Sequence, residues 1–102
     1  MINSKNKGKR GELAVVHELN KRGYDAKRGV QYKGGPDSPD VVGLPGYHIE
    51  VKWTQKTDMY GWIEQAKRDK GEDETPIVIH KKDGKPWLVI MTLEDFLNGI
   101  DK

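Results

Sequence analysis

Three charged residues in the middle of the chain have the types and spacing of a hydrolytic site. Asp40 follows Pro39, and ten residues later the chain reads Glu50-Val51-Lys52. Glu50 and Lys52 are two positions apart, so on an extended strand their side chains lie on one face, roughly 6–7 Å apart. Asp40 lies beside Glu50 if its own segment pairs with this strand. The pattern therefore predicts two carboxylates and one ammonium group near a single point.

That combination favours metal-assisted hydrolysis of a phosphodiester. Two converging carboxylates repel each other unless a cation lies between them, and their hard oxygen ligands suit Mg²⁺ or Mn²⁺. We expect Asp40 and Glu50 to bind the ion through their carboxylates and Val51 to bind it through its backbone carbonyl. Lys52 would orient or activate the attacking water and stabilise the charge that develops on phosphate. The plain alternative is a solvated strand face with an ordinary Glu/Lys pair.

The residues around these three predict the strands that would position them. β-Branched and aromatic residues gather at 40–42 and 47–53, and the Pro/Gly segment 43–46 between them predicts a turn. In the second strand, apolar side chains occupy one face and His48, Glu50 and Lys52 the other. Asp37 also follows a proline and competes with Asp40. We prefer Asp40 because it opens an apolar strand, where the backbone can fix a ligand.

The remaining segments complete one α/β domain over residues 1–102. The patterns predict, in order, a flexible basic tail at 1–7, a helix from Gly8 to a stop at Gly23, an edge strand at 24–28, a helix at 59–70, strands at 76–80 and 87–91, and a short helix capped by Thr92. The strands would form a central sheet flanked by helices. With 102 residues the chain is large enough for one core and too small for two.

Basic residues are clustered near the start of the chain, although the formal net charge is only 18 − 16 = +2. Eight of the 18 basic residues fall in the first 28 positions, and phosphate binding depends on such local clustering. We predict that Lys9 and Arg10 contact nucleic acid, with Arg28, Gln31 and Lys33 joining them from the loop that leads to Asp40. The alternative is a charged, solvated surface.

Other site classes are excluded by residue type. The chain has no cysteine, so it has neither a disulfide framework nor a thiolate zinc site. Its three histidines have no zinc-pair spacing, and no serine-nucleophile or phosphate-loop motif is present. No run approaches the roughly 18 apolar residues of a membrane span. We therefore expect a cytoplasmic protein with no membrane partner and no small-molecule cofactor.

Pro39-Asp40 followed by Glu50-Val51-Lys52 resembles the signature of the PD-(D/E)xK nuclease superfamily. From Gly8 to about Phe96 the order of elements resembles the small phage and archaeal Holliday junction resolvases of that superfamily. The resemblance implies a restriction-endonuclease-like core with a mixed sheet and a Mg²⁺-dependent DNA endonuclease, in the host cytoplasm if a phage encodes it. Ser38 lies closer to Asp40 than the serine of the archaeal pattern, so we leave it out of the catalytic set.

The resemblance adds two residues to the expected site. Glu12 matches a glutamate on the first helix that joins the metal site. Its plain alternative is a first-turn glutamate stabilised by the helix dipole. Gln65 matches a glutamine on the helix that follows E-x-K and would position a water or a phosphate oxygen, whereas the alternative is an exposed helix former.

Junction specificity is implied by the resemblance only. A four-way junction has two-fold symmetry, which favours a homodimer with two opposed sites, and Trp53, Trp62 and Trp87 are candidate interface residues. Two alternatives stay open. One is a nuclease acting on flaps, nicks or duplex DNA through the same site. The other is a DNA-binding module that is catalytically silent.

Overall fold

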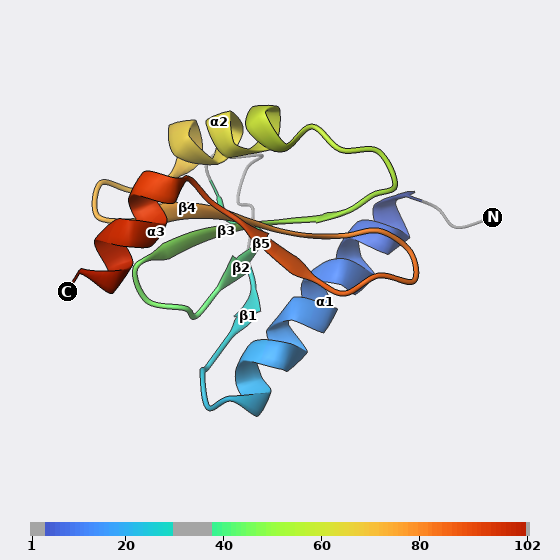
Figure 1. The fold of residues 1–102 in the computed structure, drawn as a ribbon. Helices are drawn as coiled ribbons and strands as arrows, with labels where there is room; N and C mark the ends of the chain where they lie inside the picture. Colours follow the sequence, from blue (N-terminus) through green and yellow to red (C-terminus); the bar gives the residue numbers. More distant parts are fainter. Residues whose placement is uncertain (1–3, 30–37, 102) are drawn as a thin grey trace.

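A five-stranded mixed sheet forms the centre of the computed structural model, which describes residues 4–29 and 38–101 (Figure 1). The strands lie in the spatial order β1 (Lys27–Arg28), β2 (Val41–Val42), β3 (Tyr47–Trp53), β4 (Thr75–Lys81) and β5 (Leu88–Ile90). The helices are α1 (Ser4–Lys21), α2 (Met59–Asp69) and α3 (Leu93–Ile100). Strands β3 and β4 are parallel, and every other neighbouring pair is antiparallel. The predicted α/β class and mixed sheet are confirmed.

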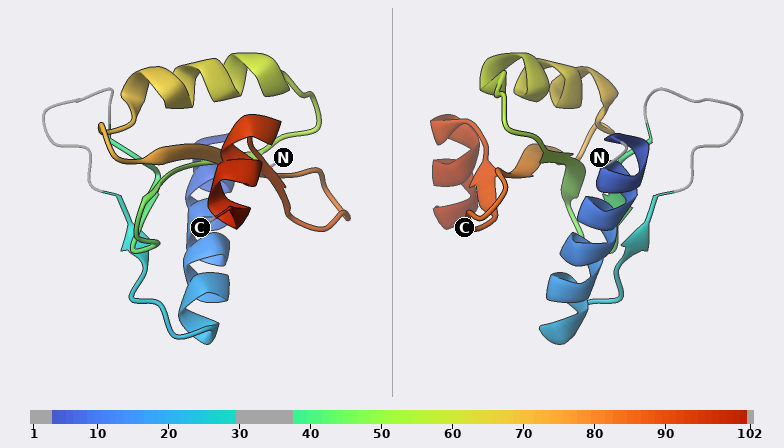
Figure 2. Two further views of the ribbon diagram at one scale, coloured as in Figure 1. Left: turned by 60° about the vertical axis from the view of Figure 1, so that its left-hand side comes forward. Right: turned by 90° about the vertical axis from the view of Figure 1, so that its right-hand side faces the viewer.

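Helices cover both faces of the central strands. Helix α1 lies on one face and α2 on the other, while α3 lies beyond β5, at the opposite end of the sheet from β1 (Figure 2). Helix α2 connects β3 to its parallel neighbour β4, as a crossover connection requires. Strand β3 is consequently buried on both faces, and the predicted catalytic strand is the centre of the domain.

The alternation of β3 divides the core into two parts. On the α1 face, Ile49 and Val51 pack with Val15 of the helix. On the α2 face, Ile63 and Ala66 of the helix pack on Val78, which lies beside Glu50 in the β3–β4 register. The polar face of β3 thus lies under α2, and Glu50 is only 5% exposed. The solvated strand face that was the plain alternative does not hold for Glu50.

Two elements differ from their predicted bounds. Helix α1 begins at Ser4, so residues 4–7 of the predicted tail are its first turn. Lys7 explains this extension, because its Nζ lies 3.0 Å from Asp83 Oδ1 in the β4–β5 connection. Strand β1 has only two residues, because the backbone N–H and C=O of Ala26 are bonded to the Asn20 side chain. Both differences arise from contacts across the fold.

The C-terminal half follows the predictions closely. Asp58 caps α2 by accepting a hydrogen bond from Gly61 N at 3.2 Å, and Thr92 caps α3 through Asp95 N at 3.1 Å. None of the helices in the described ranges has the length and apolar character needed to cross a membrane.

Candidate active site

Asp40 is held by backbone bonds on two sides at the point where β2 and β3 meet. Its N–H donates to Ile49 O at 2.8 Å, and its carbonyl accepts from Gly29 N at 2.8 Å. A β-carbon on Gly29 would overlap the carbonyl oxygen of Pro39, so only glycine permits this close approach. The Asp40 carboxylate itself accepts a bond from Val51 N at 2.8 Å. The predicted ligand is therefore fixed in position by its neighbours.

The bond from Val51 also locates the Val51 carbonyl. In an extended strand the N–H and C=O of one residue point toward the same neighbouring strand. Because the N–H of Val51 points to Asp40, its C=O is directed to the same edge. Strand β2 pairs with β3 only at Ile49, so this part of the edge lies beyond the strand pairing. A carboxylate and a backbone carbonyl thus face one space.

Glu12 reaches the same region from α1. Together with Arg28, Gly29, Pro39 and Asp40 it lines a polar cavity of about 230 Å³. Arg28 Nε donates to Glu12 Oε1 at 2.8 Å, so the glutamate is already paired with a cation. The structure therefore brings together Glu12, Asp40 and Arg28, although Arg28 was expected only as a DNA contact.

Glu50 is buried next to a histidine that the sequence analysis did not select. His48 is 1% exposed, and its Nε2 lies 2.6 Å from Glu50 Oε2. Its Nδ1 is buried and has no hydrogen-bond partner among residues 4–29 and 38–101, and Glu74 Oε1 lies 3.8 Å away. The available signal was the spacing of two residues, which places His48 and Glu50 on one face of β3.

The carboxylates around His48 determine its protonation. Burial opposes the charged form and is the largest single influence on the His48 pKa. The hydrogen bond and charge of Glu50, with the charges of Glu74 and Asp69, outweigh burial and raise this pKa above 6.5. The imidazolium form therefore offsets part of the negative charge of buried Glu50.

The pKa of Asp40 depends on its burial and on the charged residues near it. The pKa of Asp40 is raised from 3.8 to about 7, chiefly by burial. The hydrogen bond from the N–H of Val51 opposes this shift, and the charges of Glu50 and Glu12 add to it. The charge of Lys52 lowers the Asp40 pKa. The charges of these three side chains thus act on Asp40, and their convergence on one metal ion stays a prediction.

The donor set fits a hard divalent cation, although its members are paired with basic groups. Within residues 4–29 and 38–101, no three His, Asp or Glu side chains are grouped so that they could hold a metal ion. Glu12 is bonded to Arg28 and Glu50 to His48. Carboxylate and carbonyl oxygens are the ligands that Mg²⁺ prefers, and the charges of Glu50 and Glu12 add to the burial that raises the Asp40 pKa.

The remaining predicted site residues make fewer contacts with the candidate site or lie outside the described residues. Lys52 is half-buried on the same side of β3 as Glu50, and Gln65 is half-buried on α2, the helix that covers that side. No hydrogen bond of the Gln65 side chain is found within the described ranges. Lys9 and Arg10 are exposed on α1. Gln31, Lys33 and Asp37 lie outside the residues that the structure describes.

Comparisons with known proteins agree with this fold and motif. The family model described as "Phage putative PDDEXK endonuclease" matches residues 3–102. A crystal structure of Hjc, a Holliday junction resolvase from the hyperthermophile Archaeoglobus fulgidus, is similar with a TM-score of 0.61 and 27% sequence identity. The similarity covers 83% of this chain and 72% of that chain. Among curated proteins, none matches the sequence.

The raised pKa of Asp40 predicts how the free protein responds to pH. When a carboxyl group has a higher pKa in the folded state than in the unfolded state, the protein loses stability as the pH rises from the unfolded-state pKa toward the folded-state pKa. The change from 3.8 to about 7 corresponds to ~4 kcal/mol at most. Asp40→Asn should therefore raise the free energy of unfolding at pH 8 in EDTA, with little effect at pH 4, as measured by urea denaturation.

Asp25→Asn is the matched control, because Asp25 is exposed in the turn after α1. It should change stability by no more than about 0.5 kcal/mol at either pH. If the Asp40→Asn variant were less stable than the wild type at pH 8, the raised pKa of Asp40 would be contradicted.

Proposed function

The chain belongs to the phage PDDEXK endonuclease family, and from this premise we propose a divalent-metal-dependent endonuclease that resolves four-way DNA junctions. One observation carries the proposal. The Asp40 carboxylate accepts a hydrogen bond from the backbone of Val51, inside the E-x-K sequence, and lines one polar cavity with Glu12. Clustered carboxylates can bind a metal cation, and that cation together with Lys52 can bind the phosphate of a nucleic acid.

The proposed ligands are the carboxylates of Asp40 and Glu50, the carbonyl of Val51 and, from α1, Glu12. Mg²⁺ or Mn²⁺ held there would supply positive charge to the phosphate and its leaving oxygen. His48 and Arg28 are the partners that Glu50 and Glu12 have in the free protein. They keep these carboxylates neutralised until the ion binds.

The chain's own residues then act on water and phosphate. Hydrolysis joins the oxygen of water to phosphorus and breaks one ester P–O bond. Water gives up one proton, and the leaving oxygen gains one. The ammonium group of Lys52 orients the water and stabilises the charge on the non-bridging oxygens. Arg28, once released from Glu12, is available to a phosphate, and Gln65 positions the water or a phosphate oxygen.

The proposal of a branched substrate is supported by similarity to a Holliday junction resolvase and by the symmetry of the substrate. A junction presents two equivalent strands, so two identical sites related by a two-fold axis can cut both. The substrate is therefore proposed together with a homodimer. A nuclease acting on flaps, nicks or duplex DNA is the alternative that shares this site. A catalytically silent DNA-binding module is the alternative that lacks its activity.

An apolar surface at the β5 end of the sheet supports the dimer. No residue of α3 is buried, and six apolar side chains of β5 and α3 are between 45% and 71% exposed: Leu88, Val89, Leu93, Phe96, Leu97 and Ile100. Together they present on the order of 500 Å² of apolar surface, which marks an interaction site. That is close to the apolar part of the ~800 Å² that each partner contributes to a standard interface.

A second copy of the chain fits this surface better than DNA does. A groove of about 550 Å³ lies between the end of β5 and Phe96 of α3, and the apolar face of another α3 has the matching chemistry. Helix α3 carries Glu94 and Asp95 and no basic residue, so it repels a polyanion. The three tryptophans first considered for the interface are half-buried, with Trp53 against Trp87 and Trp62 against His80.

Cleavage of a labelled immobile four-way junction tests the activity. The wild-type protein should place paired symmetric nicks in the junction in Mg²⁺ and none in EDTA. Asp40→Asn and Lys52→Ala should each lower the rate by at least about 100-fold, because each removes a group that acts on the reacting phosphate. DNA affinity should change little.

Linear duplex and flap substrates of the same sequence serve as controls. Cutting spread over all substrates would retain the site and reject junction specificity. Tight binding without cleavage in either Mg²⁺ or Mn²⁺ would favour the silent module. Normal cleavage by either variant would refute the site assignment.

Light scattering coupled to size exclusion tests the dimer. The wild-type protein should have about twice the chain mass of 11.6 kDa, and Leu93→Lys with Ile100→Lys should reduce it to the monomer value. Asn98→Lys on the same helix is the control and should remain dimeric. A monomeric wild-type protein at about 100 µM would rule out a stable dimer, since such interfaces usually bind more tightly.

A further inference from the structure

Positive charge is concentrated at one end of the molecule, in a cluster that we call the basic end. Its six members come from the first two turns of α1, the last residue of β4 and the β4–β5 connection: Lys7, Lys9, Arg10, Lys81, Lys82 and Lys85. Asp83 is the acid among them. Residues 7–10 and 81–87 thus carry 6 − 1 = +5, against +2 for the whole chain, which leaves the remainder at −3.

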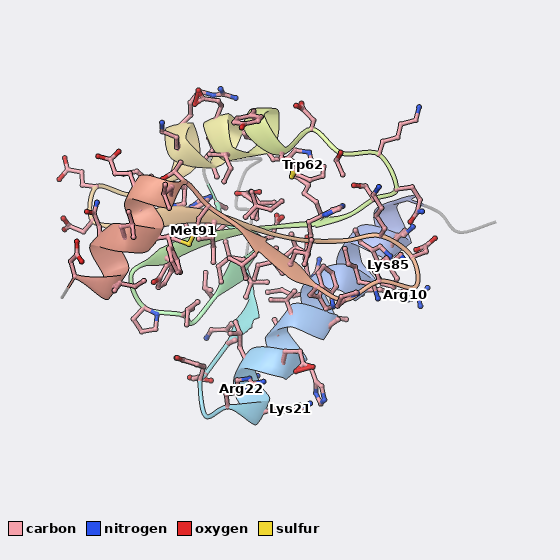
Figure 3. All side chains as sticks on the ribbon, in the orientation of Figure 1. Arg10, Lys21, Arg22, Trp62, Lys85 and Met91 are labelled. Atoms are coloured by element: carbon pink, nitrogen blue, oxygen red, sulfur yellow. The ribbon has the colours of Figure 1, made fainter. Side chains whose placement is uncertain are left out.

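Tertiary contacts gather these segments around Trp53. Lys7 Nζ and Trp53 Nε1 both lie within hydrogen-bond distance of Asp83 Oδ1, at 3.0 and 2.7 Å, and the backbone N–H of Asp83 donates to the side chain of Gln55. The connection is thereby fixed against α1 and the end of β3. Arg10 and Lys85 lie at this end of α1, whereas Lys21 and Arg22 lie at its other end (Figure 3).

The cations outnumber the acids that could neutralise them. Lys7, Arg10 and Lys81 lie 5.4, 5.3 and 4.8 Å from the centre of the Trp53 ring. Asp83 pairs with Lys7, and no ion pair is found for Arg10 or Lys81 in the part of the chain that the structure describes. The indole face offsets some of the repulsion. Three cations around one ring still form a site suited to an anion.

The basic end adjoins the candidate active site. Gly11, which lies between Arg10 and Glu12 in α1, packs against Val51 and Trp53 of β3, so the basic end and the candidate site are built on the same two elements. Lys52 itself projects from the opposite face of β3 to Trp53. DNA bound beside Glu12 and Asp40 would pass along the N-terminal half of α1 to reach Trp53 and then the β4–β5 connection. This continuity favours DNA over an acidic protein as the occupant.

We infer that the basic end is a second phosphate-binding surface, on which the β4–β5 connection holds the duplex arm that adjoins the cleaved strand. The inference rests on the proposed function for the identity of the ligand. Lys82 and Lys85 are its new members, because sequence analysis placed the DNA contacts in the first 33 residues only. Both are exposed, and neither side chain has an ion pair within the described ranges.

Salt-dependent binding of a 30-base-pair duplex in EDTA tests this surface. Lys82→Ala with Lys85→Ala should reduce the slope of log K against log salt by about 0.9 for each phosphate that is no longer neutralised, hence by up to about 1.8. Affinity near 0.15 M salt should fall roughly tenfold. Fluorescence anisotropy of end-labelled DNA measures both quantities without cleavage.

Lys21→Ala with Arg22→Ala is the matched control, because it removes the same two charges from the other end of α1. It should leave the slope within about 0.4 of the wild type, since neither residue would meet a phosphate. Equal effects of the two double variants, or no duplex binding by the wild type, would overturn the inference. A wild-type protein that binds with the expected difference but does not cleave the junction would retain this surface and reject the proposed function.

Discussion

A half-buried carboxylate that immediately precedes a two-residue strand needs a fixed donor, and the N–H of Val51 is that donor for Asp40. Strand β2 is too short to position a side chain by pairing alone. The bond from Val51 and the close approach of Gly29 fix Asp40 against β3. Strand β3 is fixed in turn by its parallel register with β4 and by helices on both faces. The rest of the fold supplies a rigid base for this contact.

The free protein keeps its carboxylates apart by pairing them with basic groups. Arg28 neutralises Glu12 and His48 faces Glu50, while burial, with the charges of Glu50 and Glu12 added to it, raises the pKa of Asp40. Each of these contacts has the same physical origin, because a carboxylate removed from water requires either a cation or a proton. Under the proposed function a metal ion would take over this neutralisation, and the basic side chains would become free to meet phosphate.

Charge and apolar surface are segregated around the domain. The basic end surrounds Trp53 beside the candidate site, whereas the apolar surface, with Glu94 and Asp95, extends over β5 and α3. The two surfaces meet at Leu88, which lines a pocket with Lys81, Lys82 and Lys85. A polyanion is attracted to the first and repelled from the second. A dimer formed through α3 would leave the part of the basic end around Trp53 open to DNA. Under the proposed function, this local cluster of charge would let a chain with a net charge of only +2 bind nucleic acid.

The sequence by itself determined the family, the α/β class, the strand 47–53 and the side of β3 on which Glu50 lies, because turn residues and a period of two act over short distances. The roles assigned to the site residues remain predictions. Only the tertiary structure decided that Arg28 meets Glu12, that residues 4–7 are helical and that α3 leaves its apolar face open. These features join segments far apart in the chain or depend on what covers a surface, and local patterns hold no information on either.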